Sequence, residues 1–173
     1  AAEDQCGVCD GDGTSCSNNP PVIDPLLDPD PILEDAGSQT INLTGIGDGD
    51  ADLTQLLTVT ATSKNTSLIP HPTVNYTSDA ATGSLSYTPS INANGTAVIT
   101  VTVTDDGGTD SGGVDSATMT FTVAVTAVND AVTLTSYISD YIVLEGAGVS
   151  TVTDLDDIFD DIDILNGDPS ALQ

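Results

Sequence analysis

Acidic residues gathered in short loops are the feature of this sequence with the clearest chemical potential. The 173-residue chain carries 27 Asp and Glu against one Lys or Arg, for a formal net charge of -26. The acidic loops are Asp10-Gly-Asp12, Asp48-Gly-Asp50-Ala-Asp52, Asp105-Asp106-Gly-Gly and Asp160-Asp161-Ile-Asp163. Carboxylates this close together repel one another, which opposes a compact state. Ca²⁺ prefers about six to eight oxygen ligands from flexible loops, so the pattern predicts calcium binding.

The near absence of cationic side chains excludes several classes of partner. With Lys64 and no Arg, the chain cannot neutralise a nucleic-acid backbone or bind an anionic membrane surface. No apolar run approaches the roughly 18 residues that span a bilayer, so membrane insertion is not expected. No signal peptide is visible, which predicts a processed mature form or a segment of a longer protein. The alternative interpretation of the acidity is a solvated surface adapted to saline surroundings.

Three cysteines, Cys6, Cys9 and Cys16, lie in the first segment, and no other cysteine follows. A Cys-X-X-Cys pair supplies half of a zinc site, but a closed site needs four ligands and His71 is distant in the sequence. In an extracellular, β-rich chain these cysteines favour a disulfide. The odd number leaves one thiol free or paired outside this chain.

Composition divides the chain into four segments. Residues 1–19 are rich in Cys, Gly and Asp and too poor in apolar side chains to form a core. Residues 20–31 are rich in proline, which predicts a semi-rigid extended linker. We expect residues 32–130 to form a β-sandwich module. Residues 131–173 are expected to begin a second module or to exchange strands with a neighbouring subunit.

Alternation of apolar and threonine side chains predicts the strands of this module. The alternating runs are residues 57–62, 84–89, 97–104 and 117–127. About seven short strands without a helical period predict an all-β, Ig-like or cadherin-like Greek-key sandwich. The core Trp and the inter-sheet Cys pair of true immunoglobulin domains are absent.

Two short echoes indicate internal repetition. Ile32-Leu-Glu34 is echoed by Ile142-Val-Leu-Glu145, and Gly47-Asp48-Gly-Asp50 is echoed by Asp160-Asp161-Ile-Asp163. The spacing between the two Glu positions is about one Ig-like domain.

As a set, these motifs resemble the bacterial cadherin-like and Ig-like tandem repeats of extracellular adhesins and surface fibres. The matching pieces are Leu33-Glu34-Asp35, Asp48-Gly-Asp50-Ala-Asp52, Val101-Thr-Val-Thr-Asp105-Asp106-Gly-Gly and Val125-Thr-Ala-Val-Asn129-Asp130-Ala. The resemblance covers residues 32–130 and treats residues 131–173 as a truncated copy.

The resemblance implies that calcium sits between successive modules. The ligands that it implies there are Glu34, Asn129 and Asp130, with Asp161 and Asp163 from the following half-module and Asp105 or Asp106 completing the shell. Asp48 and Asp50, in the same loop as Asp52, would serve the opposite end and face whatever precedes the module. The family's Asp-Arg-Glu element is absent, and Val132 replaces the proline usual after Asn-Asp-Ala.

The cysteine segment resembles a short Cys/Gly/Asp repeat of extracellular proteins. Asp10 and Asp12 are placed as in the opening of an EF-hand loop, which makes them candidate calcium ligands. The twelfth position of that loop is Pro21 instead of Glu, which excludes a complete EF-hand.

Together these patterns predict a structural module of an extracellular, calcium-stabilised fibre, stalk or adhesin at the cell surface. Its expected partners are copies of itself or adjacent repeats, joined head to tail, with a surface glycan or protein as a further candidate ligand. The alternative is a calcium-dependent carbohydrate-binding sandwich, which the small number of aromatic rings disfavours. No catalytic residues are expected, because His71 lies between prolines and no Gly-X-Ser-X-Gly motif occurs.

Overall fold

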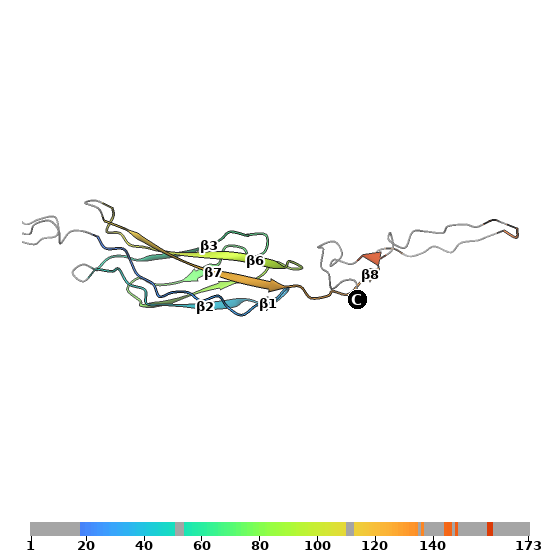
Figure 1. Cartoon of the computed structure of the whole chain (residues 1–173), viewed down its shortest axis with the longest axis horizontal. Coiled ribbons are helices and arrows are strands. Elements are labelled where there is room, and N and C mark those ends of the chain that lie inside the picture. Colours follow the sequence, from blue (N-terminus) through green and yellow to red (C-terminus); the bar gives the residue numbers. More distant parts are fainter. Residues whose placement is uncertain are drawn as a thin grey trace, which may run out of the picture. The chain divides into compact units, whose positions relative to one another are not determined.

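The computed structural model describes residues 18–50, 54–109, 113–134, 136, 144–146, 148 and 159–160. The chain falls into two compact units, residues 1–126 and 127–173. Within the described ranges all regular structure is β, and no helix there is long and apolar enough to cross a membrane (Figure 1). The cysteines and the acidic residues Asp10 and Asp12 lie outside the described residues.

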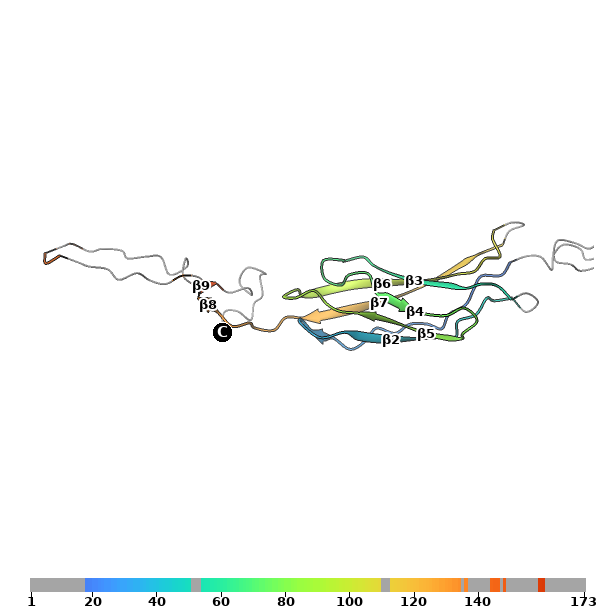
Figure 2. The same cartoon turned by 180° about the vertical axis from the view of Figure 1, so that it is seen from behind.

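The first unit is a sandwich of two sheets. Its strands are β1 (Ile32–Leu33), β2 (Gln39–Thr44), β3 (Thr58–Ser63), β4 (Thr73–Asn75), β5 (Thr82–Tyr87), β6 (Gly95–Thr104) and β7 (Ser116–Thr126). The larger sheet has the order β1-β7-β6-β3 and the smaller sheet the order β2-β5-β4. Figures 1 and 2 show these sheets as two layers, with β3, β6 and β7 in one and β2 and β5 in the other.

The strand order is that of an Ig-like sandwich. The chain changes sheet between β1 and β2, between β2 and β3, between β3 and β4, and again between β5 and β6, which produces Greek-key crossings. Strand β1 runs parallel to β7, and the other neighbours within each sheet are antiparallel. The expected all-β, Ig-like Greek-key sandwich is confirmed.

Alternation along the strands separates a dry face from a wet one. On β6, Ala97, Ile99, Val101 and Val103 are buried, while the intervening threonines face outward. The core also takes Phe121, Val123 and Val125 from β7 and Leu43, Leu85 and Tyr87 from the smaller sheet. No strand of the first unit contains a charged residue, so all of its described Asp, Glu and Lys residues lie in the connecting segments.

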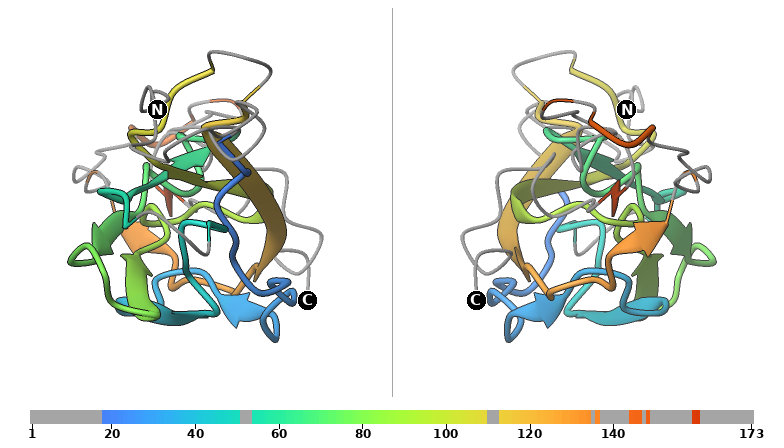
Figure 3. Two further views of the ribbon diagram at one scale, coloured as in Figure 1. Left: turned by 90° about the vertical axis from the view of Figure 1, so that its left-hand side faces the viewer. Right: turned by 90° about the vertical axis from the view of Figure 1, so that its right-hand side faces the viewer.

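Residues 18–31, here called the leading segment, are part of the sandwich. Pro21 and Ile23 are buried, and Val22 and Gly47 exchange backbone hydrogen bonds of 2.8 and 3.1 Å. The Asp28 carboxylate accepts a hydrogen bond from the backbone N of Thr122 in β7 (2.6 Å), and Figure 3 shows the leading segment (blue) beside β7 (gold).

Residues 20–31 were expected to form a semi-rigid extended linker, and in the structure part of this stretch packs on the sandwich. Prolines lack a backbone donor, but an edge segment does not need every donor, so a proline-rich stretch can still line the edge of a sheet. Burial of alternate side chains then fixes it to the core.

In the second unit, β8 (Thr133–Leu134) pairs antiparallel with β9 (Phe159–Asp160).

If the leading segment belongs to the core, truncating its buried side chain must weaken the fold. Ile23 is 6% exposed, so Ile23→Ala should lower the free energy of unfolding by about 2–4 kcal/mol through lost burial and a cavity. Urea denaturation monitored by circular dichroism measures the change. Leu27, 84% exposed in the same segment, provides the control, and Leu27→Ala should stay within about 0.5 kcal/mol of the parent. Equal effects of the two variants would contradict this assignment.

Candidate metal centre

Two acidic loops and the start of the leading segment meet at one end of the first unit. Thr104 at the end of β6 faces Ser116 at the start of β7, so the loop holding Asp105 and Asp106 lies at this end. Thr58, the first residue of β3, also faces Thr104, which brings the connection from β2 to the same end. The backbone N of Val114 donates to the backbone O of Asn18 (3.0 Å), which places the leading segment there too.

The side-chain amide of Asn18 joins these segments. Asn18 is 7% exposed, and its Nδ2 donates to Asp105 Oδ1 (2.9 Å), the backbone O of Gly108 (3.1 Å) and the backbone O of Val114 (2.9 Å). Its Oδ1 accepts a hydrogen bond from Gln55 Nε2 (2.6 Å). One side chain thus satisfies polar groups from both acidic loops.

Two glycines, Gly107 and Gly49, leave room for the leading segment to approach the loops. A Cβ at Gly107 would lie 2.2 Å from Asn18 Oδ1 and 2.4 Å from Gln55 Nε2. A Cβ at Gly49 would lie 2.2 Å from the backbone O of Pro20, and Gly49 has a φ of 79°, a left-handed conformation that glycine adopts freely. The glycines between the acids therefore let the loops close around the leading segment.

Backbone and side-chain donors hold the carboxylates of this end in place. The Asp48 carboxylate accepts hydrogen bonds from the backbone N of Asp50 (3.3 Å) and of Gln55 (3.2 Å). Asp50 accepts from Gln55 Nε2 (3.2 Å) and from the backbone N of Asn19 (3.3 Å). Asp106 Oδ1 accepts from the backbone N of Leu56 (2.9 Å).

Two oxygens at the centre of this network have no hydrogen-bond partner. Asp105 Oδ2 and Gln55 Oε1 are both buried, in residues that are 6% and 7% exposed. Leaving a buried acceptor unpaired costs about 1–3 kcal/mol, and more when the group is charged. Both atoms are acceptors, so either a donor or a cation would satisfy them.

The donor set fits a hard cation that accepts amide as well as carboxylate oxygens. Among the residues that the structure describes, no three His, Cys, Asp or Glu side chains converge closely enough to hold a metal alone. A site here would therefore combine Asp105 with the amide oxygen of Gln55 and with neighbouring carboxylates. Ca²⁺ accepts such mixed oxygen ligands, whereas zinc sites use Cys, His and carboxylate groups.

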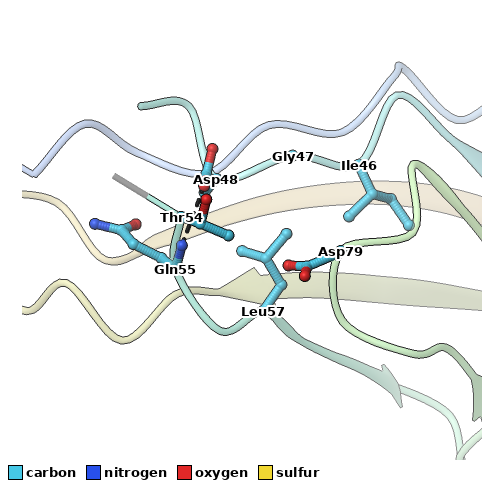
Figure 4. A pocket seen from close by; sticks show the side chains of 7 residues that line it. All are labelled: Ile46, Gly47, Asp48, Thr54, Gln55, Leu57 and Asp79. Atoms are coloured by element: carbon cyan, nitrogen blue, oxygen red, sulfur yellow. Dashed lines mark hydrogen bonds between the residues drawn. The ribbon is translucent and has the colours of Figure 1, made fainter. Parts of the chain in front are cut away.

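A pocket of about 340 Å³ lies next to this network, and Figure 4 shows its lining. Asp48, Thr54 and Gln55 contribute to it, together with Leu57 and Asp79. The nearby Tyr76 hydroxyl is buried without a hydrogen-bond partner. Burial raises the pKa of Tyr76, and the negative charges of Asp79 and Asp48 raise it further. The negative charges of Asp79 and Asp48 thus act on the Tyr76 hydroxyl.

The structure brings together some of the residues predicted to bind calcium and separates others. Asp48, Asp50, Asp105 and Asp106 share one end. Glu34 lies at the other end, because its backbone N donates to the backbone O of Thr126, the last residue of β7 (2.9 Å). Asp105 and Asp106 therefore do not complete a shell around Glu34, which is a correction to the implied grouping.

The remaining predicted ligands lie in the second unit or outside the described residues. Asn129 and Asp130 belong to the second unit, where Asn129 Nδ2 donates to the backbone O of Asp130 (2.9 Å). Asp52, Asp161 and Asp163 lie outside the described residues.

Sequence reasoning missed Asn18 and Gln55. A signal for Asn18 was present, because Asn18-Asn19 precedes Pro20 much as Asn129-Asp130 precedes Ala131. Gln55 lies among uncharged residues after the acidic loop and carries no motif of its own.

Comparisons with known proteins return no matching family model and no matching curated protein. Among solved structures, the chain is similar to titin domains Z1Z2 in complex with telethonin, with 16% identity, a TM-score of 0.43, and coverage of 70% of this chain and 55% of that chain. It is also similar to S-layer protein SbsC domains 4 and 5 (15% identity, TM-score 0.32, coverage 61% and 53%) and domains 5-6 (16% identity, TM-score 0.34, coverage 73% and 58%). The chain thus spans little more than half the length of each of these structures, and at these scores the likenesses carry no argument about function.

The hub role of Asn18 predicts a large effect of its truncation. Asn18→Ala removes the amide from four buried or partly buried partners, so the free energy of unfolding should fall by at least about 2 kcal/mol. Asn19→Ala, at the exposed neighbouring position, should cost less than about 1 kcal/mol and provides the matched control. Denaturant titration of both variants measures the difference, and near-equal losses would show that the Asn18 amide does not tie the loops together.

The buried Tyr76 hydroxyl predicts a specific alkaline response. Because the folded pKa of Tyr76 lies above its ordinary value of 10.0, ionisation of this group favours the unfolded chain, and stability falls as the pH rises from 10.0 through the folded pKa. Tyr76→Phe should therefore reduce the alkaline loss of stability. Burial also raises the pKa of Tyr87, so a part of the alkaline loss of stability should remain in the Tyr76→Phe variant.

At neutral pH, Tyr76→Phe removes an unpaired hydroxyl and should leave stability unchanged or higher. Denaturation midpoints from pH 7 to 11 measure both effects. A loss of more than about 1 kcal/mol at pH 7 would mean that the hydroxyl makes a stabilising contact.

Proposed function

We propose that this chain is a structural module of an extracellular, calcium-stiffened fibre, stalk or adhesin. The observation that carries the proposal is the pair of buried, unpaired oxygens, Asp105 Oδ2 and Gln55 Oε1, inside an acidic end of the sandwich. In a chain of net charge -26, a cation at this end would reduce repulsion among the surrounding carboxylates and could take these oxygens as ligands.

The residues that would hold the ion are Asp105 and Gln55, with Asp48 and Asp50 as further carboxylates beside them. When bound, calcium would supply positive charge and coordination to oxygens that lack donors. The Asn18 amide already attaches the leading segment to the loop that holds Asp105. Stiffening that loop would stiffen the point at which the chain enters the sandwich.

An extracellular location is part of the proposal. Extracellular calcium modules work with dissociation constants of about 10⁻⁴–10⁻³ M, which suits a site built partly from amide oxygens. A stiffened end would connect the module to its neighbour, which is either an adjacent module or another copy of the chain.

We propose a structural, non-catalytic protein, and the placement of the aromatic rings favours this role over carbohydrate binding. Among the described residues of the first unit the aromatic rings are Tyr76, Tyr87 and Phe121, and none of these is exposed. A sugar-stacking surface needs exposed rings. His71 Nδ1 accepts a hydrogen bond from the backbone N of Ser63 (3.0 Å), which gives it a structural contact.

Calcium should stabilise the chain more than ionic strength alone. With free calcium tenfold above its dissociation constant, the free energy of unfolding should rise by about 1.4 kcal/mol, a shift in melting temperature of about 4–8 °C. Thermal melts in EDTA, in calcium, and in NaCl of matched ionic strength measure this. An equal rise in NaCl would support the solvated acidic surface and contradict the calcium site.

Two charge-matched variants locate the effect. Asp105→Asn and Asp30→Asn each remove one carboxylate, but Asp30 is exposed in the leading segment. The calcium-dependent shift should disappear in Asp105→Asn and persist in Asp30→Asn. Loss in both variants would mean that calcium acts through net charge. Sedimentation of the parent in calcium and in EDTA tests whether stiffened ends also associate between chains.

A further inference from the structure

The described strands of the second unit repeat a pairing found where the leading segment joins the first unit. In the first unit, Val22 and Gly47 form an isolated antiparallel bridge. In the second, Thr133 pairs antiparallel with Asp160. Thr133 follows Val22 by 111 positions, and Asp160 follows Gly47 by 113 positions. The same antiparallel pairing therefore recurs at nearly the same spacing along the chain.

The residues next to this pair correspond as well. Leu134 pairs with Phe159, and these residues stand 111 and 113 positions after Ile23 and Ile46. Ile23 and Ile46 are both buried in the core of the first unit. Apolar residues thus recur at the two positions that anchor the leading segment to the first sandwich.

A turn with unusual backbone geometry recurs at the same spacing. Glu34-Asp35 forms a turn in which Asp35 has a φ of 61°, and Glu145-Gly146 forms a turn in which Gly146 has a φ of 83°. Asp35 thus adopts a left-handed conformation that is uncommon outside glycine, and the residue 111 positions later is a glycine, which adopts that conformation freely. The flanking sequences agree too, since Leu33-Glu34-Asp35-Ala36-Gly37 aligns with Leu144-Glu145-Gly146-Ala147-Gly148.

The asparagine that organises the first unit also has a counterpart. Asn129 follows Asn18 by 111 positions. The change in spacing from 111 to 113 falls between Gly37 and Ile46, so the second copy is two residues longer in that stretch. In the first unit this stretch holds β2 (Gln39–Thr44), and two extra residues preserve the alternation of side chains between the two faces of a strand.

We propose that the second unit opens another copy of the same sandwich, started in the same register as the first. The partner that follows the first sandwich is then a module of its own kind in the same chain, instead of a strand donated to a neighbouring molecule. This inference rests on backbone pairing and sequence spacing, and it does not depend on calcium binding.

Cross-strand disulfide trapping tests the register directly. In a background with Cys6, Cys9 and Cys16 changed to Ser, Thr133→Cys is combined with Asp160→Cys. Residues that face each other in an antiparallel pair have Cα atoms about 4.5–5.5 Å apart, which suits a disulfide. Val22→Cys with Gly47→Cys is the positive control in the first unit. Leu134→Cys with Asp160→Cys is shifted by one residue, and successive residues of a strand point to opposite faces, so it should not close.

The expected result is a bridge within one chain for both facing pairs, formed at least about tenfold more efficiently than in the shifted pair. Non-reducing gels and mass spectrometry of peptides distinguish bridges within a chain from bridges between chains. Bridges between chains at Thr133 and Asp160 would overturn the proposal in favour of strand exchange. A control pair that closes while the 133–160 pair stays open, or a maximum at the shifted pair, would overturn it in favour of an unrelated hairpin.

Discussion

Repulsion among carboxylates is the constraint on which this structure depends. With 27 acidic residues and a single Lys, the chain has almost no opposite charge with which to form ion pairs. The first unit keeps every charged residue out of its strands, so the sheets are built from uncharged side chains, most of them apolar or hydroxyl-bearing. The acids are confined to connections, and at one end of the sandwich four of them share a single hydrogen-bond network.

Asn18 makes that crowded end compatible with folding. A neutral amide donates to Asp105 and accepts from Gln55, so it links two acidic loops without adding charge. The hydrogen-bond donors at this end nevertheless do not reach every acceptor oxygen, and Asp105 Oδ2 and Gln55 Oε1 remain buried without partners. The proposal of a calcium-stiffened module follows from this local excess of oxygen atoms.

The strands were the part of the fold that the sequence predicted well, because alternation of Val or Ile with Thr is a direct signal of one buried and one wet face. Ala97, Ile99, Val101 and Val103 are buried as the pattern predicts. The leading segment was not predicted, since Pro21 and Ile23 alternate over too short a run to stand out among the prolines. The candidate site was predicted in its acidic residues but not in its grouping. Loop sequences do not reveal which end of a sandwich they reach, and Asn18 and Gln55 act through burial that only the folded chain creates.

The proline-rich leading segment has a consequence for solubility. Exposed sheet edges invite strands from other molecules, and this is a common route to aggregation. In the first unit the leading segment lies along β2, through the backbone N of Asp24 and O of Thr44, and reaches β7 through Asp28. Pro20, Pro21, Pro25, Pro29 and Pro31 offer no backbone donors, and Asp24, Asp28 and Asp30 add negative charge between them. A chain with hardly any basic residues to place on its edges thus protects this side of the sandwich from lateral aggregation with proline and aspartate.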